Sequence, residues 1–253
     1  MAIVIAVTLR PSSAASFSAF AINKGFEQLR VCVAYPNVNV KIVGTHSGIS
    51  IGEDGPSQMS VEETSLACSL PGLVVLTPAD EPSTKALVHA AAAHVGPVFI
   101  RTGRPKVPLI YNGNQKFVIG QAVELVEGSD LTIIANGLLV AEAIRASEML
   151  EAEGLSARVL DLHTVKPLDR DAIARAAAET GAIVTAEEHL VDGGMGVRVA
   201  QVVASTHPCP MEFVGIENTY AESATPAELL DKYRLLARDV AAAARKVVAR
   251  KRR

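Results

Sequence analysis

The chain has 253 residues, a formal net charge of -3 and a composition in which 49% of residues are hydrophobic but only 4% are aromatic. This length and aliphatic bias fit one large or two ordinary α/β domains, and we expect two. So small a charge gives no reason to expect nucleic-acid binding, and without a signal-peptide pattern or any apolar run near the ~20 residues that span a bilayer, the sequence predicts a cytoplasmic protein with no membrane contact.

The first half of the chain alternates predicted helices and strands. Apolar residues at helical spacing predict a helix from Phe17 through Phe20 and Phe26 to Val33, and an aliphatic run at 38–45 predicts a buried strand. The same patterns predict further helices at 61–70 and 80–94 and further strands at 73–79 and 97–103. Residues 104–116 concentrate proline, glycine and asparagine, so we expect a linker there, with a boundary near Asn114 between domains 1–114 and 115–253.

In the second half the alternation is more regular. Strands are predicted at 130–136, 157–163 and 182–188, and helices at 139–153, 169–180 and 193–205. A last helix is predicted to begin at Thr225, whose side chain forms a capping box with Glu228. Strands separated by helices of this length require right-handed parallel crossovers. The predicted fold class is therefore α/β, with two consecutive domains that are each a mostly parallel sheet with helices on both faces.

The stretch GTHSGISIGEDGPSQM, from Gly44 to Met59, follows a predicted strand and fills no core. Its glycines allow a ligand to approach the backbone closely, and exposed amides there can bind an anion. His46, Glu53 and Asp54 can add proton transfer or recognition of a diol. The alternative is a glycine-rich turn with solvated acids. A metal site is the weakest interpretation, because the stretch has one histidine and none of the three cysteines.

This stretch, together with SLPGLVVLTPAD, FIRTGRP, VKPLD and VTAEEHLVDGGMG further on, resembles the C-terminal half of transketolase, a thiamine diphosphate enzyme that moves a two-carbon ketol unit between sugar phosphates. The match runs from about Phe17 to the end. It implies that the first half is the pyrimidine-binding domain of that family, incomplete at its N-terminus. The second half is then the family's C-terminal domain, which mainly supports the dimer.

The resemblance implies cofactor-binding roles for two aromatic residues. Phe17 and Phe20, in ASFSAF, match positions that flank the aminopyrimidine ring of thiamine diphosphate in the family, where a phenylalanine face stacks on a flat heterocycle. Without the resemblance, the same two residues are equally well explained as core residues on one helix face. Asn23 stands where some family members have a further aromatic residue. Since asparagine has no ring, the cofactor would have less aromatic surface to stack on.

The resemblance also implies substrate-binding roles. His46 matches a histidine at the sugar-phosphate site, Asp54 matches a carboxylate that binds a substrate hydroxyl, and Gln58 takes a position that is glutamine or histidine in the family. Arg101, in FIRTGRP, matches an arginine that holds the substrate phosphate, for which a guanidinium fork is suited. The alternative for Arg101 is a surface ion pair, and for Arg104 a surface ion pair is the preferred interpretation.

Part of the catalytic apparatus of the family has no match in this sequence. In transketolases a glutamate that precedes the phenylalanines activates the cofactor, but the first acidic residue here is Glu27, after both Phe17 and Phe20. The diphosphate-binding domain with its metal ligands has no match either. We therefore assign no catalytic residue and no metal ligand, and expect this chain alone to bind thiamine diphosphate and Mg²⁺ weakly or not at all and to be inactive.

The predicted function is that of the C-terminal half of a transketolase, a cytoplasmic enzyme of the pentose phosphate pathway. The chain would form a homodimer and act on sugar phosphates only with a separate diphosphate-binding subunit. Two alternatives stay open. One is a subunit of another thiamine diphosphate enzyme, either deoxyxylulose phosphate synthase or a 2-oxo acid dehydrogenase β subunit. The other is a non-catalytic protein that keeps the fold and the dimer surface.

Overall fold

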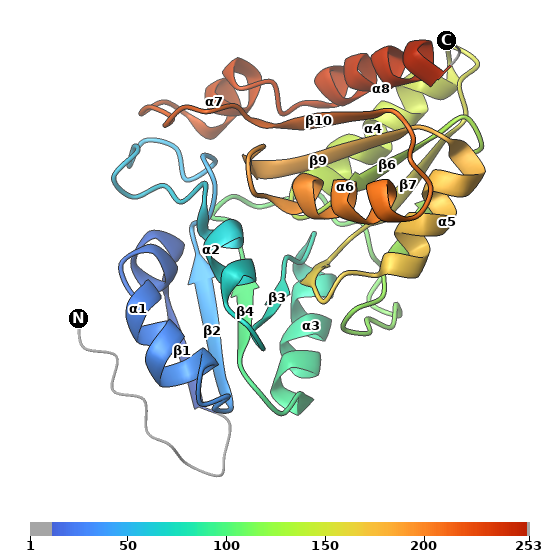
Figure 1. Cartoon of the computed structure of the whole chain (residues 1–253). Helices are drawn as coiled ribbons and strands as arrows, with labels where there is room; N and C mark the ends of the chain where they lie inside the picture. Colours follow the sequence, from blue (N-terminus) through green and yellow to red (C-terminus); the bar gives the residue numbers. More distant parts are fainter. Residues whose placement is uncertain (1–11, 252–253) are drawn as a thin grey trace.

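The first of two α/β sheets is built almost entirely from the first half of the chain (Figure 1). The structure is a computed structural model that describes residues 12–251. The strand order is β1-β2-β4-β3-β8, with β1 at Ser12–Phe17, β2 at Val40–Thr45, β4 at Val98–Arg101, β3 at Val74–Leu76 and β8 at Thr164–Lys166. All neighbours pair in parallel except β8, which runs antiparallel to β3.

The second sheet also has five strands, in the order β10-β9-β6-β7-β5. They are β10 (Met211–Ile216), β9 (Ile183–Leu190), β6 (Leu131–Ala135), β7 (Ala157–Asp161) and β5 (Val123–Val126). Pairing is parallel except between β5 and β7. The prediction of two consecutive, mostly parallel sheets is confirmed.

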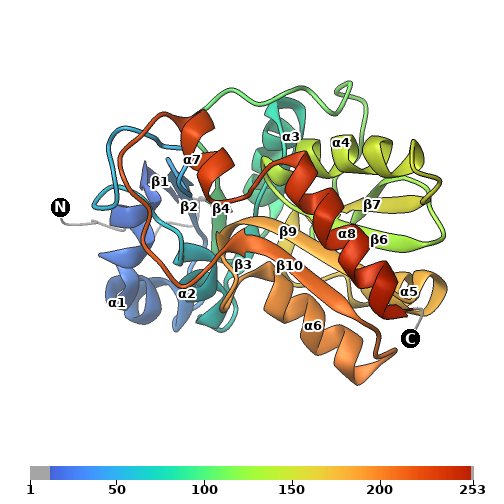
Figure 2. The ribbon, with the colours of Figure 1, turned by 90° about the horizontal axis from the view of Figure 1, so that it is seen from above.

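Helices cover both faces of each sheet (Figures 1 and 2). On the first sheet, α1 (Phe26–Leu29) with the π-helical turns η1 (Ala19–Asn23) and η2 (Arg30–Ala34), and α2 (Glu63–Ser69), lie opposite α3 (Glu81–Ala93). On the second, α4 (Leu139–Glu151) and α8 (Ala237–Lys251) lie opposite α5 (Arg170–Thr180) and α6 (Met195–Ser205). One core cluster joins residues of α1 and α2 to residues of α5 and α6, so the two sheets share a core.

Local signals at helix ends explain several boundaries. Helix α7 (Pro226–Lys232) begins after Thr225, and Thr225 and Glu228 form the predicted capping box. Helix α3 has a similar box between Asp80 and Ser83. Gly181 ends α5 with a φ of 62°, a left-handed conformation that glycine adopts without steric cost.

The predicted helix beginning at Phe17 is wrong at its start. Phe17 is the last residue of β1, and the helical segment begins at Ala19. Residues 12–16, SSAAS, have little strand propensity, but they pair along their whole length with β2, and this tertiary pairing overrides local preference. Strands β5, β8 and β10 were not predicted either. β5 and β8 are short and have no clear alternation of apolar residues.

The predicted linker has no helix or strand, and side chains of both domains hold it. Asp80 accepts hydrogen bonds from the backbone N–H groups of Ile110 and Tyr111, and the Tyr111 hydroxyl donates to Asp161 at 2.7 Å. The boundary expected near Asn114 lies in this stretch. In space the division is less simple, since β8 follows the linker in sequence but belongs to the first sheet.

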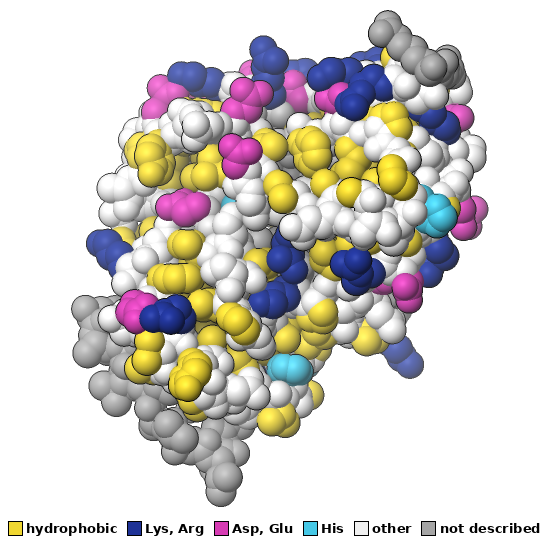
Figure 3. Space-filling view, in the orientation of Figure 1, with side chains coloured by type: hydrophobic (Ala, Val, Ile, Leu, Met, Phe, Trp, Pro, Cys, Tyr) yellow, Lys and Arg dark blue, Asp and Glu magenta, His cyan; other side chains and the backbone are white. Residues whose placement is uncertain are grey.

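The surface carries charges of both signs (Figure 3). The basic side chains along α8 pair with acids of neighbouring elements: Arg245 with Glu153, and Lys246 and Arg250 with Glu212. Between residues 12 and 251, no helix is both long enough and apolar enough to cross a membrane.

Candidate functional site

The glycine-rich loop of residues 44–59, here called the substrate loop, extends from the carboxyl end of β2, where parallel sheets bind their ligands. Gly48, Gly52 and Gly55 have φ values of 82°, 86° and 74°, which residues with a Cβ rarely adopt. Between the glycines, Ile49 and Ile51 are fully buried in the core cluster of the second domain. The backbone of the loop is therefore packed against the second domain at Ile49 and Ile51, while the acidic side chains of Glu53 and Asp54 are open to solvent.

Aromatic rings of Phe17, Phe20 and His46 gather at the start of this loop. The Phe17 ring is parallel to that of Phe20, with centroids 5.8 Å apart, and stacks on the His46 imidazole with centroids 3.8 Å apart. His46 has a φ of 57°, and its Nδ1 lies 2.9 Å from the Thr45 hydroxyl. The structure thus brings together three of the predicted site residues, the two assigned to cofactor and one assigned to substrate.

Asp54 lies on the exposed part of the same loop, beside Arg104. The Arg104 Nη1 is 3.6 Å from the nearer Asp54 carboxylate oxygen and donates a hydrogen bond to the Ile51 carbonyl at 2.7 Å. Both side chains are open to solvent, with 45% of Arg104 and 41% of Asp54 exposed. Burial lowers the pKa of His46, the charge of Arg104 lowers it further, and the charge of Asp54 opposes both. His46, Asp54 and Arg104 therefore form one electrostatic group.

We expect the change Arg104→Ala to raise the pKa of His46. Removing a nearby positive charge makes protonation of the imidazole less costly, whereas the pKa of His46 in the wild type is lowered in part by that charge. The measurement is an NMR titration of the imidazole C–H signals, with His46→Gln to assign the His46 resonance. Arg30→Ala, which removes an exposed arginine paired with Glu27, serves as the control and should leave this pKa unchanged. If the pKa of His46 is the same in Arg104→Ala as in the wild type, the charge of Arg104 does not act on His46.

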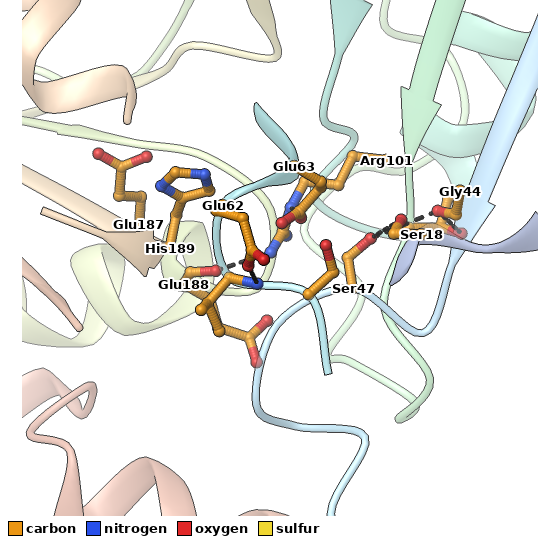
Figure 4. Close-up of polar contacts among 12 residues, drawn as sticks. Ser18, Gly44, Ser47, Glu62, Glu63, Arg101, Glu187, Glu188 and His189 are labelled. Atoms are coloured by element: carbon orange, nitrogen blue, oxygen red, sulfur yellow. Dashed lines mark hydrogen bonds and ion pairs between the residues drawn. The ribbon is translucent and has the colours of Figure 1, made fainter. Parts of the chain in front are cut away.

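Arg101 lies in a different environment, inside the protein (Figure 4). It is 5% exposed, its Nε donates to the Glu63 carboxylate at 2.5 Å, and its Nη2 donates to the Glu188 carbonyl at 2.7 Å. Burial alone lowers the pKa of a guanidinium, but here the charges of Glu63 and Glu188 raise the pKa of Arg101. The alternative of a surface ion pair is wrong for this residue, since its pair with Glu63 is buried. The phosphate contact of Arg101 stays a prediction.

The carboxylates around Arg101 were not identified from the sequence. Glu63, Glu187 and Glu188 are each at most 3% exposed and come from α2 and β9, so they meet at the junction of the two domains (Figure 4). Burial raises the pKa of Glu187 and of Glu188, against the opposing effect of Arg101. The available signal was the sequence EEH inside an otherwise apolar strand, because buried carboxylates are rare unless they are paired.

The remaining predicted substrate residue, Gln58, is half-buried near the end of the loop, where its side-chain nitrogen lies 3.4 Å from the Ser57 hydroxyl. Asn23, in η1, donates to Glu62 and accepts from Ser60, so it packs against the end of the substrate loop. Within residues 12–251, no three His, Cys, Asp or Glu side chains are grouped so that they could hold a metal ion.

Two family models match nearly the whole chain. One is described as the pyrimidine-binding domain of transketolase and matches residues 1–109, and the other is the transketolase C-terminal domain and matches residues 120–240. The chain belongs to the transketolase family. The gap between the two matches, residues 110–119, overlaps the predicted linker at 104–116, and the resemblance predicted from the sequence motifs is confirmed.

Individual relatives agree with this assignment. A 6-deoxy-6-sulfo-D-fructose transketolase subunit from Clostridium sp. (strain MSTE9) is 40% identical over 236 residues, covering 93% of this chain and 73% of the relative. A putative transketolase C-terminal section from Methanocaldococcus jannaschii is 40% identical over 238 residues, covering 93% of this chain and 74% of the relative. A solved structure of a split-gene transketolase, described as an inactive β4 tetramer, has a TM-score of 0.89 at 44% identity, covering 94% of this chain and 76% of that one. This chain is similar to transketolase C-terminal sections, as predicted.

Proposed function

We propose that this chain transfers ketol units between sugar phosphates as one part of a split transketolase, together with a separate diphosphate-binding subunit, thiamine diphosphate and Mg²⁺. The observation that supports this most directly is the grouping of His46, Asp54 and Arg104 beside the aromatic pair Phe17 and Phe20. The group lies at the carboxyl ends of β2 and β4, where a ligand of a parallel sheet binds.

The aromatic pair fits the pyrimidine ring of the cofactor. Parallel rings with centroids 5.8 Å apart leave less than the roughly 7 Å that two successive carbon contacts of about 3.5 Å would need, so a third ring does not fit between them. One face of Phe17 is already covered by His46, and the Lys24 ammonium group lies 4.7 Å from the Phe20 ring centroid, so the pyrimidine would have to share these faces or displace one of these side chains. The described residues offer no metal cluster, and the diphosphate with its metal therefore falls to the partner subunit in this proposal. Bound thiamine diphosphate supplies the carbon nucleophile that carries the ketol unit.

The substrate would lie across the loop side chains. Arg104 is exposed and next to His46, so we assign the phosphate contact to these two residues and not to the buried Arg101. A guanidinium offers several N–H donors to an oxyanion, and His46 adds a further donor when it is protonated. Asp54 accepts a hydrogen bond from a substrate hydroxyl. In the absence of substrate, Asp54 and Arg104 neutralise one another.

The kinetic prediction separates these roles. In the reconstituted enzyme, Arg104→Ala should mainly raise KM for a phosphorylated aldose and leave the same aldose without its phosphate nearly unchanged, because the phosphate is the proposed partner of Arg104. Asp54→Ala should lower kcat/KM for both acceptors, since the substrate hydroxyl loses its partner. The decrease should correspond to a loss of about 1 to 3 kcal/mol of transition-state stabilisation. The measurement is steady-state kinetics on the two acceptors.

Reconstitution itself tests the proposal. The chain is mixed with a diphosphate-binding transketolase subunit, thiamine diphosphate and Mg²⁺, and ketol transfer is followed against each component alone. We expect activity only in the complete mixture, and a self-associated state of this chain, at least a homodimer, by light scattering. The proposal is abandoned if complexes form with such subunits and none transfers a ketol unit. Equal losses on both acceptors in Arg104→Ala would remove that arginine from the phosphate site.

A further inference from the structure

The second domain holds the substrate loop at several points. Ile49 and Ile51 are buried in its core cluster, and Gly52 packs so closely on Pro226, at the start of α7, that a Cβ added there would lie 2.9 Å from the proline ring. Just past the loop, the Leu190 N–H at the end of β9 donates to the Val61 carbonyl at 2.8 Å. The loop thus has the second domain along one side, as Figure 1 shows for α7.

Glu188 of β9 makes the polar contact between the second domain and the loop backbone. Its Oε1 accepts a hydrogen bond from the Ser50 N–H at 2.6 Å, and its own carbonyl accepts from Arg101. Glu188 is 2% exposed. Its carboxyl group also fills the space beside Gly48, where an added Cβ would come closer than the 3.0 Å that Cβ contacts essentially never go below. A buried acceptor therefore fixes the backbone over Gly48 to Ser50.

We propose that Glu188 is a positioning residue for the substrate loop: by fixing the backbone between Gly48 and Ser50, it sets the directions in which His46 and Asp54 meet the sugar phosphate. The inference rests on the proposed function and deepens it, because it gives the second domain a part in substrate binding beyond support of a dimer. His46 is two residues before Gly48, and Asp54 four residues after Ser50. A rotation of the backbone between Gly48 and Ser50 would therefore change the orientation of both the His46 and the Asp54 side chains.

The charges that face Glu188 agree with this role. Arg101 from β4 lies against its backbone, Glu63 from α2 accepts from the same guanidinium, and Glu187 precedes it on β9. Arg101 thus links the two domains, since it binds Glu63 of the first and the Glu188 carbonyl of the second. The Glu188 carboxylate itself accepts a hydrogen bond from the Ser50 N–H.

Hydrogen–deuterium exchange of the loop amides in the full chain tests the proposal without any partner. In Glu188→Ala the Ser50 amide loses its acceptor and should exchange at least about 10-fold faster, as read from the peptide over 46–59 or by NMR. Glu188→Gln keeps an oxygen acceptor of the same length and should restore most of the protection. If Glu188→Ala does not fold, Glu188→Met, which fills the volume without an acceptor, takes its place.

Glu187 provides the matched control, since it is the adjacent residue, buried to the same degree and also a hydrogen-bond acceptor. Its carboxylate binds the Met195 and Gly196 N–H groups at the start of α6. Glu187→Ala should therefore speed exchange at α6 and leave residues 46–59 unchanged. An unaltered Ser50 amide in Glu188→Ala, or equal acceleration in Glu187→Ala, would overturn the proposal.

Kinetics of the reconstituted enzyme give the second readout. Glu188→Ala should raise KM for the phosphorylated aldose several-fold while changing kcat less, and Glu188→Gln should restore KM. Equal changes in kcat and KM for both variants, without rescue by glutamine, would contradict a positioning role. If no variant and no wild-type mixture transfers a ketol unit, the proposed function fails, while the exchange data still decide whether Glu188 holds the loop.

Discussion

Replacing Gly48 by alanine is expected to reduce the free energy of unfolding by about 3 to 5 kcal/mol, from overpacking of a buried site and from a left-handed backbone that alanine resists. The added methyl group would collide with the carboxyl group of Glu188, which is buried and held by the Ser50 N–H. Neither partner can move without breaking a hydrogen bond. Chemical denaturation at fixed pH measures the loss.

Gly154 separates the two causes of this effect. Its φ of 79° is close to the 82° of Gly48, but nothing lies within 4 Å of a Cβ built on it. Gly154→Ala should therefore cost only the backbone term, about 1 to 2 kcal/mol. In the double variant Gly48→Ala/Glu188→Ala the collision is absent, so the two changes should not add. If the losses in the free energy of unfolding from Gly48→Ala and Glu188→Ala add fully, or if Gly48→Ala and Gly154→Ala cost the same, then Glu188 does not collide with a side chain at position 48.

The second large effect is expected for Arg101→Met, which should reduce the free energy of unfolding by about 3 to 5 kcal/mol. The change leaves the Glu63 carboxylate buried without its ion-pair partner, leaves the Glu188 carbonyl without its donor, and removes a positive charge near the Glu188 carboxylate. Methionine keeps much of the apolar volume, so the loss reports the charge. Arg30→Met, which breaks the exposed pair with Glu27, should cost no more than about 1 kcal/mol. In the reconstituted enzyme Arg101→Met should affect phosphorylated and unphosphorylated acceptors equally.

The loss in Arg101→Met should also depend on pH. Burial already raises the pKa of Glu187 and Glu188 in the folded protein, and Arg101 opposes this rise. A folded-state pKa above the unfolded value gives stability that is present below the unfolded pKa and lost as pH rises. Without Arg101 the folded pKa values rise further, so the difference in stability between wild type and variant should grow as pH rises above the folded pKa values of the wild type, and level off above those of the variant. A difference independent of pH would place the cost in packing instead.

Much of the fold could be predicted because many of its strands are aliphatic runs bounded by glycine and proline, and α3, α5 and α7 carry clear end signals. The run at 97–103 became β4 (Val98–Arg101), and the capping box at Thr225 starts α7. β1 and β8 could not be predicted in this way. Their residues become strands only by pairing with β2 and β3, partners that are distant in sequence and invisible to a local pattern.

The candidate site shows the same limit at the level of single side chains. The motif placed both arginines near the site, but their roles depend on which way each one points. Along β4, Phe99 and Arg101 face α2, while Val98 and Ile100 face α3, so the strand alternation directs Arg101 inward. Arg104 lies beyond the strand and is free to reach Asp54. The pairing of Glu188 with Ser50 joins residues 138 positions apart, and only the folded chain reveals it.

The antiparallel strand β8 has a consequence for modularity. Although the linker separates two units in the sequence, Lys166 of β8 pairs with Val75 of β3, and the Lys166 ammonium group donates to the carbonyls of Cys68 and Leu70 near the end of α2. A polypeptide cut near residue 114 would leave the edge of β3 without a partner, and an exposed strand edge favours aggregation. Recombination that exchanges the second unit for a homologous one must therefore match this strand to a foreign β3. Gene segments that encode the two units are therefore constrained to stay together. When homologous transketolases recombine, the products should fold best where β3, β8 and the start of the substrate loop come from the same parent.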